Sequence, residues 1–586
     1  MFTELYPYDA EVLSNPDQDT LRSLAQEHTP LVFKTAAGNL NKVSRNKARM
    51  AKFTYVIDNQ DRPEGISQKL ISQADADALI ARQRTYIESA GRLIEVQGYL
   101  GVGPRAVPVQ WLYTVEGANI AGMQQIMAFP RSDVENGAAS QPFEPTFRVV
   151  YTPGLGLDDM PGGQAIIVDL AAYTTYIIGP DYFGESKKAA LRMLNEFAFS
   201  QGALVLHAGA KSVRLGDTHV AMTIMGLSGT GKTTTTFSKQ GDVTQPIQDD
   251  MVTLWPGGEV SITENGCFAK TFGLTEDTEP VIYRGTVSSE AWVENAYLEA
   301  DGDFDFFKDA LSPTEVARWR DTLIATGAPA DNVDRYISGD VTAADVSDAM
   351  GVLDDGWEFV KWTQNGRSII PMSCVEDAAD LHAIPAVKYM GILNRDEGAD
   401  AATPGIVRFT SPEQAAGFFM LGETTKTSAA GKEVGKTRSP FTQPFFPLSF
   451  GLQADRFSEL AATMPDVTLW MMNTGYVGGD ARTVKQGGGF KVKIRHSSAM
   501  LEALLTDVIV WKRDPDFGYE IVDADDPANA ALVDAVGAEL LNPVKFYERT
   551  GQQAAYRSWV SAMKAERRAF LEKFDVAESI ITATVG

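Results

Sequence analysis

Length, composition and charge already narrow the class of protein. The chain has 586 residues, 44% of them hydrophobic and 22% charged, which is the balance of a globular protein large enough for two or more domains. Its formal net charge of −25 argues against nucleic acid or an anionic membrane surface as a partner, because both would repel it. Two cysteines are too few for a disulfide framework or a cysteine metal cluster.

The N-terminus and the hydropathy pattern indicate the compartment. The first residues, MFTELYPYDAEVL, lack the basic flank and the apolar core of a secretory signal. No stretch of the sequence approaches the roughly eighteen uninterrupted apolar residues of a membrane span. We therefore expect a cytoplasmic enzyme whose partners are small molecules, with neither nucleic acid nor a membrane among them.

The first part of the chain alternates expected strands and helices, which predicts an α/β protein. Short apolar strands are expected over 93–96 and 165–170, and a helix over 186–201, where apolar residues recur at helical spacing. A strand-like run over 202–206 ends at His207. Taken alone, a histidine in this position is more often structural than a ligand.

An apolar strand over 219–225 leads into a glycine-rich stretch. It fits the phosphate-loop pattern G-x-x-x-x-G-K-[ST] with Gly226, Leu227, Ser228, Gly229, Thr230, Gly231, Lys232 and Thr233, followed by Thr234. Glycines allow backbone N–H groups to point at phosphate oxygens, and the start of the following helix attracts negative charge. The lysine supplies a cation for the outer phosphates, and the next hydroxyl reaches a metal ion. The stretch predicts a site for a nucleotide polyphosphate.

Two acids, Asp249 and Asp250, follow a strand-like segment over 243–247. An isolated pair of this kind is usually a solvated turn. Directly after a phosphate loop it is typical of a second motif, whose acid holds magnesium.

Helix-capping residues and composition predict the remaining elements. Ser312 and Ser411 are each followed by proline and, three residues on, by an acid or an amide, which predicts two helix starts. The acidic region 301–355 is expected to be helical, and a last helix is expected over 556–574. Loops are expected over 424–447 and 485–489.

Five motifs stand in a fixed order along the chain: YFGESKK over 182–188, LHAGA over 206–210, GLSGTGKTT over 226–234, DD at 249–250, and NGCFAKT over 265–271. They resemble the ATP-type phosphoenolpyruvate carboxykinases, which carry Y-G-G-E-M-K-K, H-C-S-A-N, G-L-S-G-T-G-K-T-T, G-D-D and G-G-C-Y-A-K-T at similar spacings. The resemblance implies an α/β fold of two domains with mixed sheets. It places an N-terminal substrate-binding domain over 1–218 and a P-loop nucleotide-binding domain over 219–586.

The resemblance also implies the metal ligands. Lys188, His207 and Asp250 would bind a manganese ion, and Thr233 would hold the magnesium ion that accompanies the nucleotide. A lysine ligates only as the neutral amine, and burial beside another cation favours loss of its proton. A mixed nitrogen and carboxylate shell suits manganese better than magnesium.

In the family reaction, oxaloacetate loses carbon dioxide and the resulting enolate takes the γ-phosphoryl group of ATP, which gives phosphoenolpyruvate. The implied catalytic residues are Lys188, Lys232, Asp249 and Arg367. The resemblance implies that Tyr182 and Arg367 contact the substrate. It implies Lys270 and Glu279 as further contacts of the nucleotide.

One further arginine should bind the substrate carboxylate, as in the family's G-R-S-P-K-D-K-Y-I-V. Arg49 aligns with it without gaps, because Lys52 and the Tyr-Val-Ile run from Tyr55 follow as expected. The glycine and Ser-Pro flanks are missing, however, and Arg45 after Ser44 is a rival.

Three regions depart from the family. The loop NTGYVGGDARTVKQGGGFKVKIRHSS is longer and richer in glycine, so the base contacts near 491–497 do not match and GTP is not excluded as the nucleotide. The acidic stretch 301–356 has no counterpart of that length and is expected to be an insertion. The segment 424–447 resembles the family's lid in general character but differs from it in sequence.

Three functions remain open. The first is a phosphoenolpyruvate carboxykinase that uses ATP, manganese and magnesium. The alternative is a related kinase that phosphorylates another small acid or enol without decarboxylation. The third is a nucleotide-binding regulator without turnover, and the implied metal ligands and Arg367 argue against it, because binding alone needs only the phosphate loop.

Overall fold

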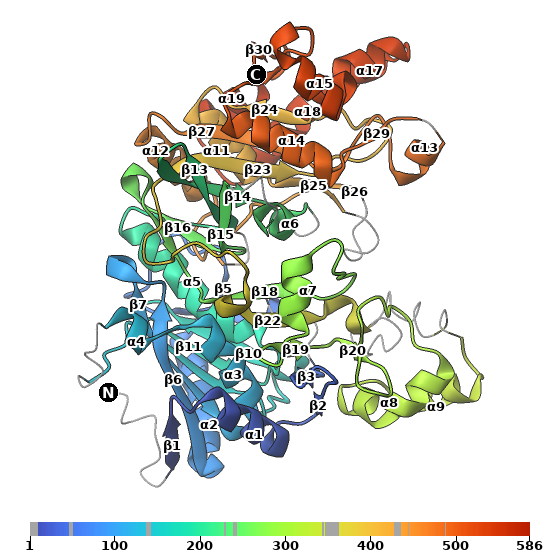
Figure 1. Cartoon of the computed structure of the whole chain (residues 1–586). Helices are drawn as coiled ribbons and strands as arrows, with labels where there is room; N and C mark the ends of the chain where they lie inside the picture. Colours follow the sequence, from blue (N-terminus) through green and yellow to red (C-terminus); the bar gives the residue numbers. More distant parts are fainter. Residues whose placement is uncertain are drawn as a thin grey trace. The chain divides into compact units, whose positions relative to one another are not determined.

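The computed structural model describes residues 10–45, 51–135, 142–227, 230–237, 243–342, 345, 362–426, 435–442, 445–486 and 488–586. The chain forms two compact units (Figure 1). Unit 1 comprises Met1–Leu194 and Glu264–Glu376, and unit 2 comprises Asn195–Thr263 and Asp377–Gly586. This division differs from a single boundary at 218/219, because the chain passes between the units after residues 194, 263 and 376.

The larger sheet of unit 1 has nine strands in the order β1-β6-β7-β9-β11-β10-β4-β5, with β8 paired to β6. Parallel and antiparallel neighbours alternate irregularly, so the sheet is mixed as expected. The strands are β1 (Glu11–Ser14), β4 (Thr54–Asp58), β5 (Lys69–Ser72), β6 (Arg92–Leu100), β7 (Val107–Thr114), β8 (Phe129–Pro130), β9 (Phe147–Thr152), β10 (Ala165–Asp169) and β11 (Thr174–Ile178). The expected strand at 93–96 lies within β6, and the strand expected at 165–170 is confirmed as β10, which ends one residue earlier.

A second sheet of unit 1 has the order β18-β22-β19-β3-β2. Its strands are β2 (Val32–Lys34), β3 (Leu40–Lys42), β18 (Gly266–Lys270), β19 (Trp292–Glu294) and β22 (Arg367–Pro371). Helix α3 (Ala118–Met127) is buried almost throughout and contacts strands of both sheets. Gly122 of α3 makes this packing possible, because a Cβ there would lie 2.4 Å from the ring of Trp292.

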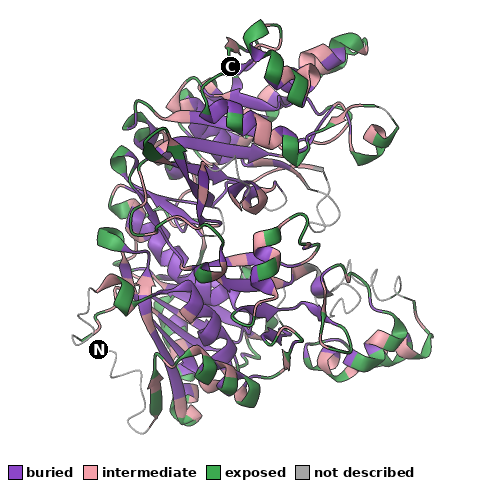
Figure 2. Cartoon of the chain, viewed as in Figure 1, coloured by how far each residue is buried: buried purple, intermediate pink, exposed green. Residues whose placement is uncertain are grey.

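Helices surround these sheets and expose their outer faces, whereas the strands are mostly buried (Figure 2). In unit 1 they are α1 (Gln18–His28), α2 (Gln73–Ala90), α4 (Arg131–Val134), α7 (Pro280–Thr286), α8 (Pro313–Ala325) and α9 (Ala330–Ser338). α5 (Gly184–Ser200) confirms the helix expected over 186–201 and runs from unit 1 into unit 2.

The acidic region, expected to be helical over 301–355, contains α8 and α9, and its residues 343–344 and 346–355 lie outside the described part of the chain. The Ser312 hydroxyl and the Glu315 carboxylate form the capping box that starts α8. α8 and α9 pack with Val43, Tyr297 and neighbouring apolar residues in one cluster, beside the short hairpin β20 (Tyr297–Leu298) and β21 (Phe304–Asp305).

Unit 2 is built on an eight-stranded mixed sheet in the order β15-β13-β14-β23-β27-β24-β31-β30. The strands are β13 (Ala208–Leu215), β14 (Thr218–Met225), β15 (Thr244–Gln248), β23 (Val387–Asn394), β24 (Ile406–Arg408), β27 (Thr468–Asn473), β30 (Trp511–Arg513) and β31 (Glu520–Val522). β14, β23 and β27 are parallel neighbours, so their carboxyl ends meet at one edge. A three-stranded sheet, β12 (Leu204–Leu206), β16 (Val252–Leu254) and β17 (Val260–Ile262), completes this part.

The helices of unit 2 are α6 (Lys232–Phe237), α11 (Pro412–Leu421), α12 (Gly451–Ala462), α13 (Ala481–Lys485), α14 (Ile494–Leu505), α15 (Ala530–Val536), α16 (Ala538–Leu541), α17 (Pro543–Arg549), α18 (Gln553–Glu572) and α19 (Glu578–Val585). Ser411 caps α11 as expected. The helix expected last is α18, but α19 follows it and contacts α11. Among the described helices, none combines the length and apolar character needed to cross a membrane.

The segment 424–447 is not simply a loop, which corrects that expectation. β25 (Glu423–Lys426) and β26 (Gly435–Arg438) pair antiparallel within it, and residues 427–434 lie outside the described part of the chain. A second small pair joins β28 (Tyr476–Val477) and β29 (Phe490–Lys491). The sequence did not predict β25 and β26, because both strands are polar and lack the apolar pattern of a half-buried strand.

Candidate active site

The phosphate loop has the local structure that its sequence predicts. β14 ends at Met225 and α6 begins at Lys232, while Ser228 and Gly229 lie outside the described residues. Gly231 has a φ of +85°, which a residue with a side chain rarely adopts. A Cβ on Gly226 would lie 2.4 Å from the Thr230 hydroxyl, so only glycine fits this turn.

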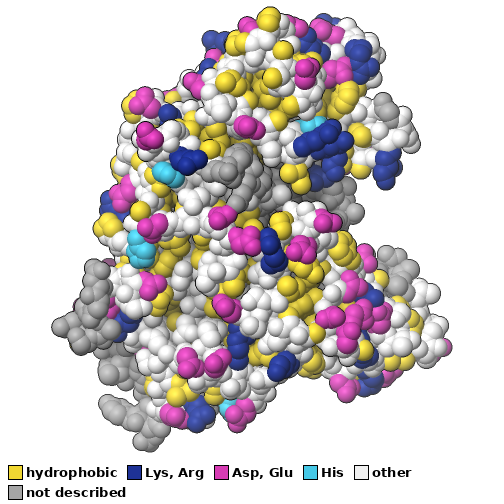
Figure 3. Space-filling view, in the orientation of Figure 1, with side chains coloured by type: hydrophobic (Ala, Val, Ile, Leu, Met, Phe, Trp, Pro, Cys, Tyr) yellow, Lys and Arg dark blue, Asp and Glu magenta, His cyan; other side chains and the backbone are white. Residues whose placement is uncertain are grey.

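A cavity of about 700 Å³ lies beside this loop in unit 2. Thr230, Gly231 and Thr234, all expected nucleotide contacts, line one wall. The other lining residues supply four cations and an apolar floor: Arg395, Lys491, Lys493 and Arg495, with Val492, Ile494 and Leu501. Figure 3 shows Lys and Arg side chains gathered over β29 and the start of α14. The cavity therefore suits a ligand that combines negative charge with an apolar ring.

Arg395 is a lining residue that sequence reasoning missed. It follows β23, and Thr474 follows β27, so both stand at the edge where β14 delivers the phosphate loop. The Thr474 hydroxyl donates to the carbonyl of Thr230 at 2.8 Å, which ties this edge to the loop. Ligands of open α/β sheets bind at the carboxyl ends of neighbouring parallel strands, and that rule would have pointed to Arg395 once the strand order was known.

The phosphate-loop lysine and two expected metal ligands form one contact group in unit 2. Lys232 Nζ donates to Asp250 Oδ1 at 2.7 Å and to the Asp250 carbonyl at 3.0 Å. The same carboxylate oxygen lies 2.9 Å from His207 Nε2. Thr233, the residue after Lys232, is half-buried in the first turn of α6, and Asp249 is buried beside Asp250.

The surroundings of His207 fit a bound metal ion. Its Nδ1 lies 3.0 Å from the carbonyl of Phe441, and its Nε2 faces the Asp250 carboxylate, so both nitrogens face acceptors. A neutral imidazole has only one N–H to donate. Two states satisfy both contacts: an imidazolium with an N–H on each nitrogen, or a cation held by Nε2 and Asp250 while Nδ1–H donates to the carbonyl and orients the ring, as is usual for metal-bound histidine. Within the described residues, no three His, Cys, Asp or Glu side chains form a metal cluster.

In unit 1, Lys188 lies in a buried charge cluster at the start of α5. Its Nζ donates to Glu185 Oε1 at 2.8 Å, and Arg192 donates to Oε2 at 2.8 Å. Burial opposes ionisation of Glu185, but Lys188 and Arg192 outweigh it and lower its pKa to about 2. Lys188 also lies over the ring of Tyr182, 5.5 Å from its centroid. The motif YFGESKK did not single out Glu185 and Arg192 as partners in the cluster around Lys188.

Two expected phosphate or substrate contacts of unit 1 stand directly opposite each other. Lys270 of β18 and Arg367 of β22 are partners in the antiparallel register. Burial, and then the charge of Arg367, lower the pKa of Lys270. Among the described residues, none forms an ion pair with either cation. Like charges in this arrangement repel each other, so a bound anion would relieve the repulsion.

Phe268 connects these residues within unit 1. The Arg367 guanidinium lies 5.7 Å and Lys187 Nζ lies 5.0 Å from its ring centroid, and the ring of Tyr182 is 6.4 Å away. The structure thus brings Tyr182, Lys187 and Arg367 around one aromatic side chain, whereas Lys188 contacts the ring of Tyr182. Glu279 begins α7 in the same unit, and its role in nucleotide binding stays a prediction.

Arg45 and Arg49 were rivals for the substrate carboxylate. Arg49 lies outside the described residues. Arg45 donates from Nη2 to the carbonyls of Pro153 and Gly179, at 2.9 and 3.0 Å, and its backbone N–H donates to Asp181. These contacts indicate that the Arg45 side chain anchors the backbone, which leaves Arg49 as the favoured prediction for the carboxylate.

Comparison with known proteins gives the family. The family model described as phosphoenolpyruvate carboxykinase matches residues 10–322 and 354–527. The chain is 27% identical to the phosphoenolpyruvate carboxykinase (ATP) of Bradyrhizobium diazoefficiens over 418 residues, which are 68% of this chain and 64% of the relative. It is 26% identical to the enzyme of that name from Afipia carboxidovorans over 450 residues, 75% of this chain and 69% of the relative.

A third relative, phosphoenolpyruvate carboxykinase (ATP) of Thermus thermophilus, is 26% identical over 413 residues, 68% of this chain and 64% of the relative. The matches with the Bradyrhizobium and Thermus proteins span slightly less than two thirds of those relatives. Residues 323–353, which the family model leaves unmatched, fall within the acidic region expected as an insertion. The chain belongs to the ATP-type phosphoenolpyruvate carboxykinase family.

Proposed function

We propose that this protein converts oxaloacetate and a nucleoside triphosphate, ATP in the first place, into phosphoenolpyruvate, carbon dioxide and the nucleoside diphosphate. The observation that carries the proposal is the contact group of Lys232, Asp250 and His207 at the phosphate loop. A nucleotide-binding regulator needs the loop but has no use for a buried histidine and carboxylate beside its lysine. The expected compartment is the cytoplasm.

Nucleotide binding is assigned to unit 2. Lys232 would exchange its contact with Asp250 for the outer phosphates, and the loop N–H groups would bind the remaining oxygens. The cations along the cavity would contact the inner phosphates, while Val492, Ile494 and Leu501 would contact the base. GTP remains an alternative nucleotide, because none of these apolar contacts selects adenine.

Two metal ions are part of the proposal. His207 and Asp250 would hold manganese, with Lys188 as the further ligand that the family resemblance predicts, and Thr233 would hold the magnesium of the nucleotide. When bound, such ions stabilise negative charge on enolate and phosphoryl oxygens. Lys188 must be neutral to ligate, whereas its ion pair with Glu185 favours the charged amine, so metal binding would have to replace that contact.

Substrate handling is assigned to unit 1. The C–C bond to the departing carboxylate breaks, carbon dioxide leaves, and the electron pair stays on the substrate as the enolate of pyruvate. The enolate oxygen then forms a bond to the γ-phosphorus while the bond to the diphosphate breaks. Lys270 and Arg367 would stabilise the anionic groups during both steps, and Arg49 would hold a carboxylate.

The test is an assay of phosphoenolpyruvate from oxaloacetate, manganese and magnesium, with ATP or GTP supplied in turn. We expect product with ATP, and at least a hundredfold loss of turnover in His207→Asn, because a metal ligand is removed. His219→Asn is the matched control, since His219 is exposed in the same unit and should be dispensable. No product, despite ATP binding that Lys232→Ala abolishes, would favour a kinase acting on another small acid or enol.

A further inference from the structure

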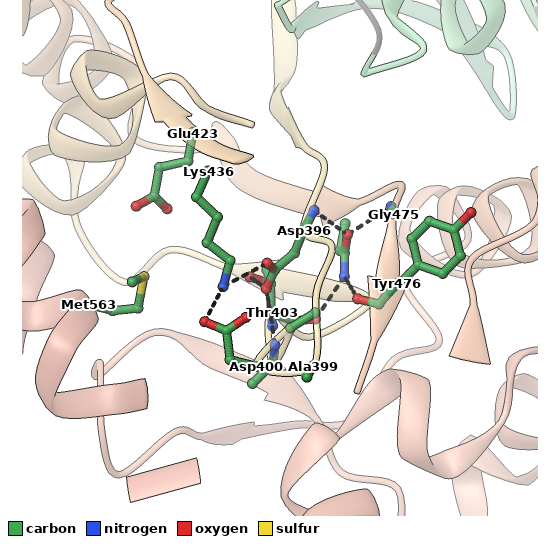
Figure 4. A network of polar contacts seen from close by, with 12 residues as sticks. Asp396, Ala399, Asp400, Thr403, Glu423, Lys436, Gly475, Tyr476 and Met563 are labelled. Carbon is green, nitrogen blue, oxygen red and sulfur yellow. Dashed lines mark hydrogen bonds and ion pairs between the residues drawn. The ribbon is translucent and has the colours of Figure 1, made fainter. Parts of the chain in front are cut away.

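A small cavity of unit 2 lies at the base of the β25–β26 hairpin, and Arg395 is the lining residue that it shares with the nucleotide cavity. Its volume is about 20 Å³, which is room for one water-sized species. Three parts of the chain line it besides β26: the segment after β23, strand β25 and helix α18. Figure 4 shows part of its wall, with Lys436 reaching between Glu423 and the carboxylates of Asp396 and Asp400.

Four residues that line this cavity carry hydrogen-bond donors without acceptors. They are Arg395 Nε, Thr425 Oγ1, Trp559 Nε1 and Arg567 Nη1, and the described residues offer none of these buried atoms a partner. Trp559 is 5% and Arg567 2% exposed, so water outside the protein does not compensate them. Leaving a buried donor unsatisfied is costly, and four such donors around one cavity point to an acceptor inside it.

The carboxylates in the wall are already occupied. Glu423 Oε1 accepts from Arg438 and Arg567 at 2.8 and 2.9 Å, and Oε2 accepts from Arg567 at 2.7 Å. Asp396 Oδ2 accepts from the backbone N–H groups of Ala402 and Thr403 and from the Thr403 hydroxyl. These two acids therefore do not serve the four remaining donors.

The charges around the cavity leave a positive remainder. Four cations line it: Arg395, Lys436, Arg438 and Arg567. Asp396 and Glu423 in the wall, together with Glu397, which pairs with Arg395, supply three largely buried carboxylates. Asp400 and Glu566 also pair with cations of the wall, but their side chains are 60% and 52% exposed, so solvent screens them. The cavity therefore has one more cation around it than largely buried carboxylates.

We propose that this cavity binds one monoatomic anion, chloride in the first place. A chloride ion accepts hydrogen bonds from several directions, whereas a water molecule accepts only about two, and it supplies the missing negative charge. Room for about one water-sized species favours a monoatomic ion over sulfate or phosphate. The bound ion bridges α18, β25 and the segment after β23, and it thereby fixes the hairpin to the C-terminal helix.

The first test is diffraction from crystals of the full chain grown in sodium bromide, with the anomalous signal of bromide recorded at its absorption edge. We expect one anomalous peak within hydrogen-bonding distance of Trp559 Nε1 and Arg567 Nη1. Density without an anomalous signal would identify a water molecule and overturn the proposal.

The second test measures thermal unfolding in sodium chloride against sodium gluconate at equal ionic strength. Chloride should raise the melting temperature of the natural protein by about 1–3 °C once it saturates the site. Thr425→Val removes one donor at nearly constant shape, and it should weaken the apparent chloride affinity about tenfold.

Thr437→Val is the matched control, because the Thr437 hydroxyl lines the same cavity but donates to the carbonyl of Thr424. It should leave the chloride effect unchanged. An equal loss in both variants, or equal melting temperatures in chloride and gluconate despite a bromide peak, would reduce the site to adventitious binding and contradict the proposal. Trp559→Phe repeats the comparison if Thr425→Val does not fold.

Discussion

The cations expected to bind phosphate or substrate, Lys232 in unit 2 and Lys270 and Arg367 in unit 1, differ in how far the protein itself neutralises them. In unit 2, Lys232 meets the carboxylate of Asp250 at 2.7 Å. In unit 1, Lys270 and Arg367 face each other in register, and the described residues offer neither an ion pair. An incoming phosphate must therefore displace an internal partner in unit 2, whereas an incoming carboxylate or phosphate relieves repulsion in unit 1.

This difference has consequences for stability as well as for binding. A cation that forms an ion pair inside the protein stabilises the folded state. Its removal leaves the partner carboxylate buried without a counter-charge. A cation that faces another cation opposes folding, so its removal should cost activity but not stability. The same chemical change is therefore expected to act in opposite directions in the two units.

The largest effect is expected at the phosphate loop. Lys232→Ala should lower turnover about a thousandfold, because the cation that stabilises the transferred phosphoryl group is lost. It should also lower the free energy of unfolding, since Asp250 loses its partner. Steady-state assay and urea unfolding measure the two effects. Lys573→Ala, at an exposed position of the same unit, serves as the control. Unchanged stability in Lys232→Ala would show that the ion pair with Asp250 does not stabilise unit 2.

A second effect on stability is expected at Glu423, a buried carboxylate that pairs with two arginines of unit 2. Burial opposes ionisation of Glu423, but Arg567 and Arg438 outweigh it and lower its pKa to about 2. Glu423→Gln should lower the free energy of unfolding by about 3 kcal/mol, since it leaves two buried guanidinium groups short of a counter-charge. Glu520→Gln breaks a more exposed pair with Arg408 and should cost under about 1 kcal/mol.

The same cluster predicts a pH dependence. Because the pKa of Glu423 is lower in the folded state than its ordinary value of 4.5, its contribution is complete above that pH and is lost as pH falls toward 2. Unfolding at a series of pH values should therefore show a smaller acid-induced loss of stability in Glu423→Gln than in the natural protein. Equal losses would show that Glu423 does not drive the acid response.

In unit 1, Arg367→Gln should lower kcat/KM for oxaloacetate about a hundredfold, because a charge that stabilises the reacting anion is removed. Affinity for ATP, measured by calorimetry without oxaloacetate, should change less than kcat/KM. Arg284→Gln is the control, since Arg284 pairs with Glu376 on the surface of the same unit. An unchanged kcat/KM in Arg367→Gln would remove Arg367 from the proposed reaction.

The smallest effect is the most discriminating. Lys270→Gln should raise the free energy of unfolding by up to about 0.5 kcal/mol, because it ends the repulsion with Arg367 across the strands. Urea unfolding of this variant beside Lys69→Gln, a surface lysine of the same unit, measures the change. A clear decrease in stability would mean that Lys270 has a favourable partner and would contradict the account of unit 1.

The sequence predicts correctly those elements that are specified by residues close together in the chain. The strand, loop and helix around Lys232 follow from a glycine pattern within a short stretch, and the starts of α8 and α11 follow from capping residues. The β25–β26 hairpin was missed because its strands are polar. Sheet order, and with it Arg395, depends on pairings between distant segments, which no local pattern carries.

The contacts that position the site residues join segments that lie even farther apart in the sequence. The carbonyl that orients His207 belongs to Phe441, 234 positions away, and Glu423 meets Arg567 across 144 positions. Neither partner carries a motif of its own. The family resemblance supplied the expected roles of Lys188, His207 and Asp250, while Glu185 and Phe268 emerged only from the folded chain.

The most direct test of the proposed reaction is its stoichiometry. Oxaloacetate labelled in the departing carboxylate and ATP labelled in the γ-phosphate would be supplied together with manganese and magnesium. We expect labelled carbon dioxide and labelled phosphoenolpyruvate to form in equal amounts, with both rates lost in Lys232→Ala. Transfer of labelled phosphate to an organic acid without release of carbon dioxide would contradict the carboxykinase reaction and establish a kinase.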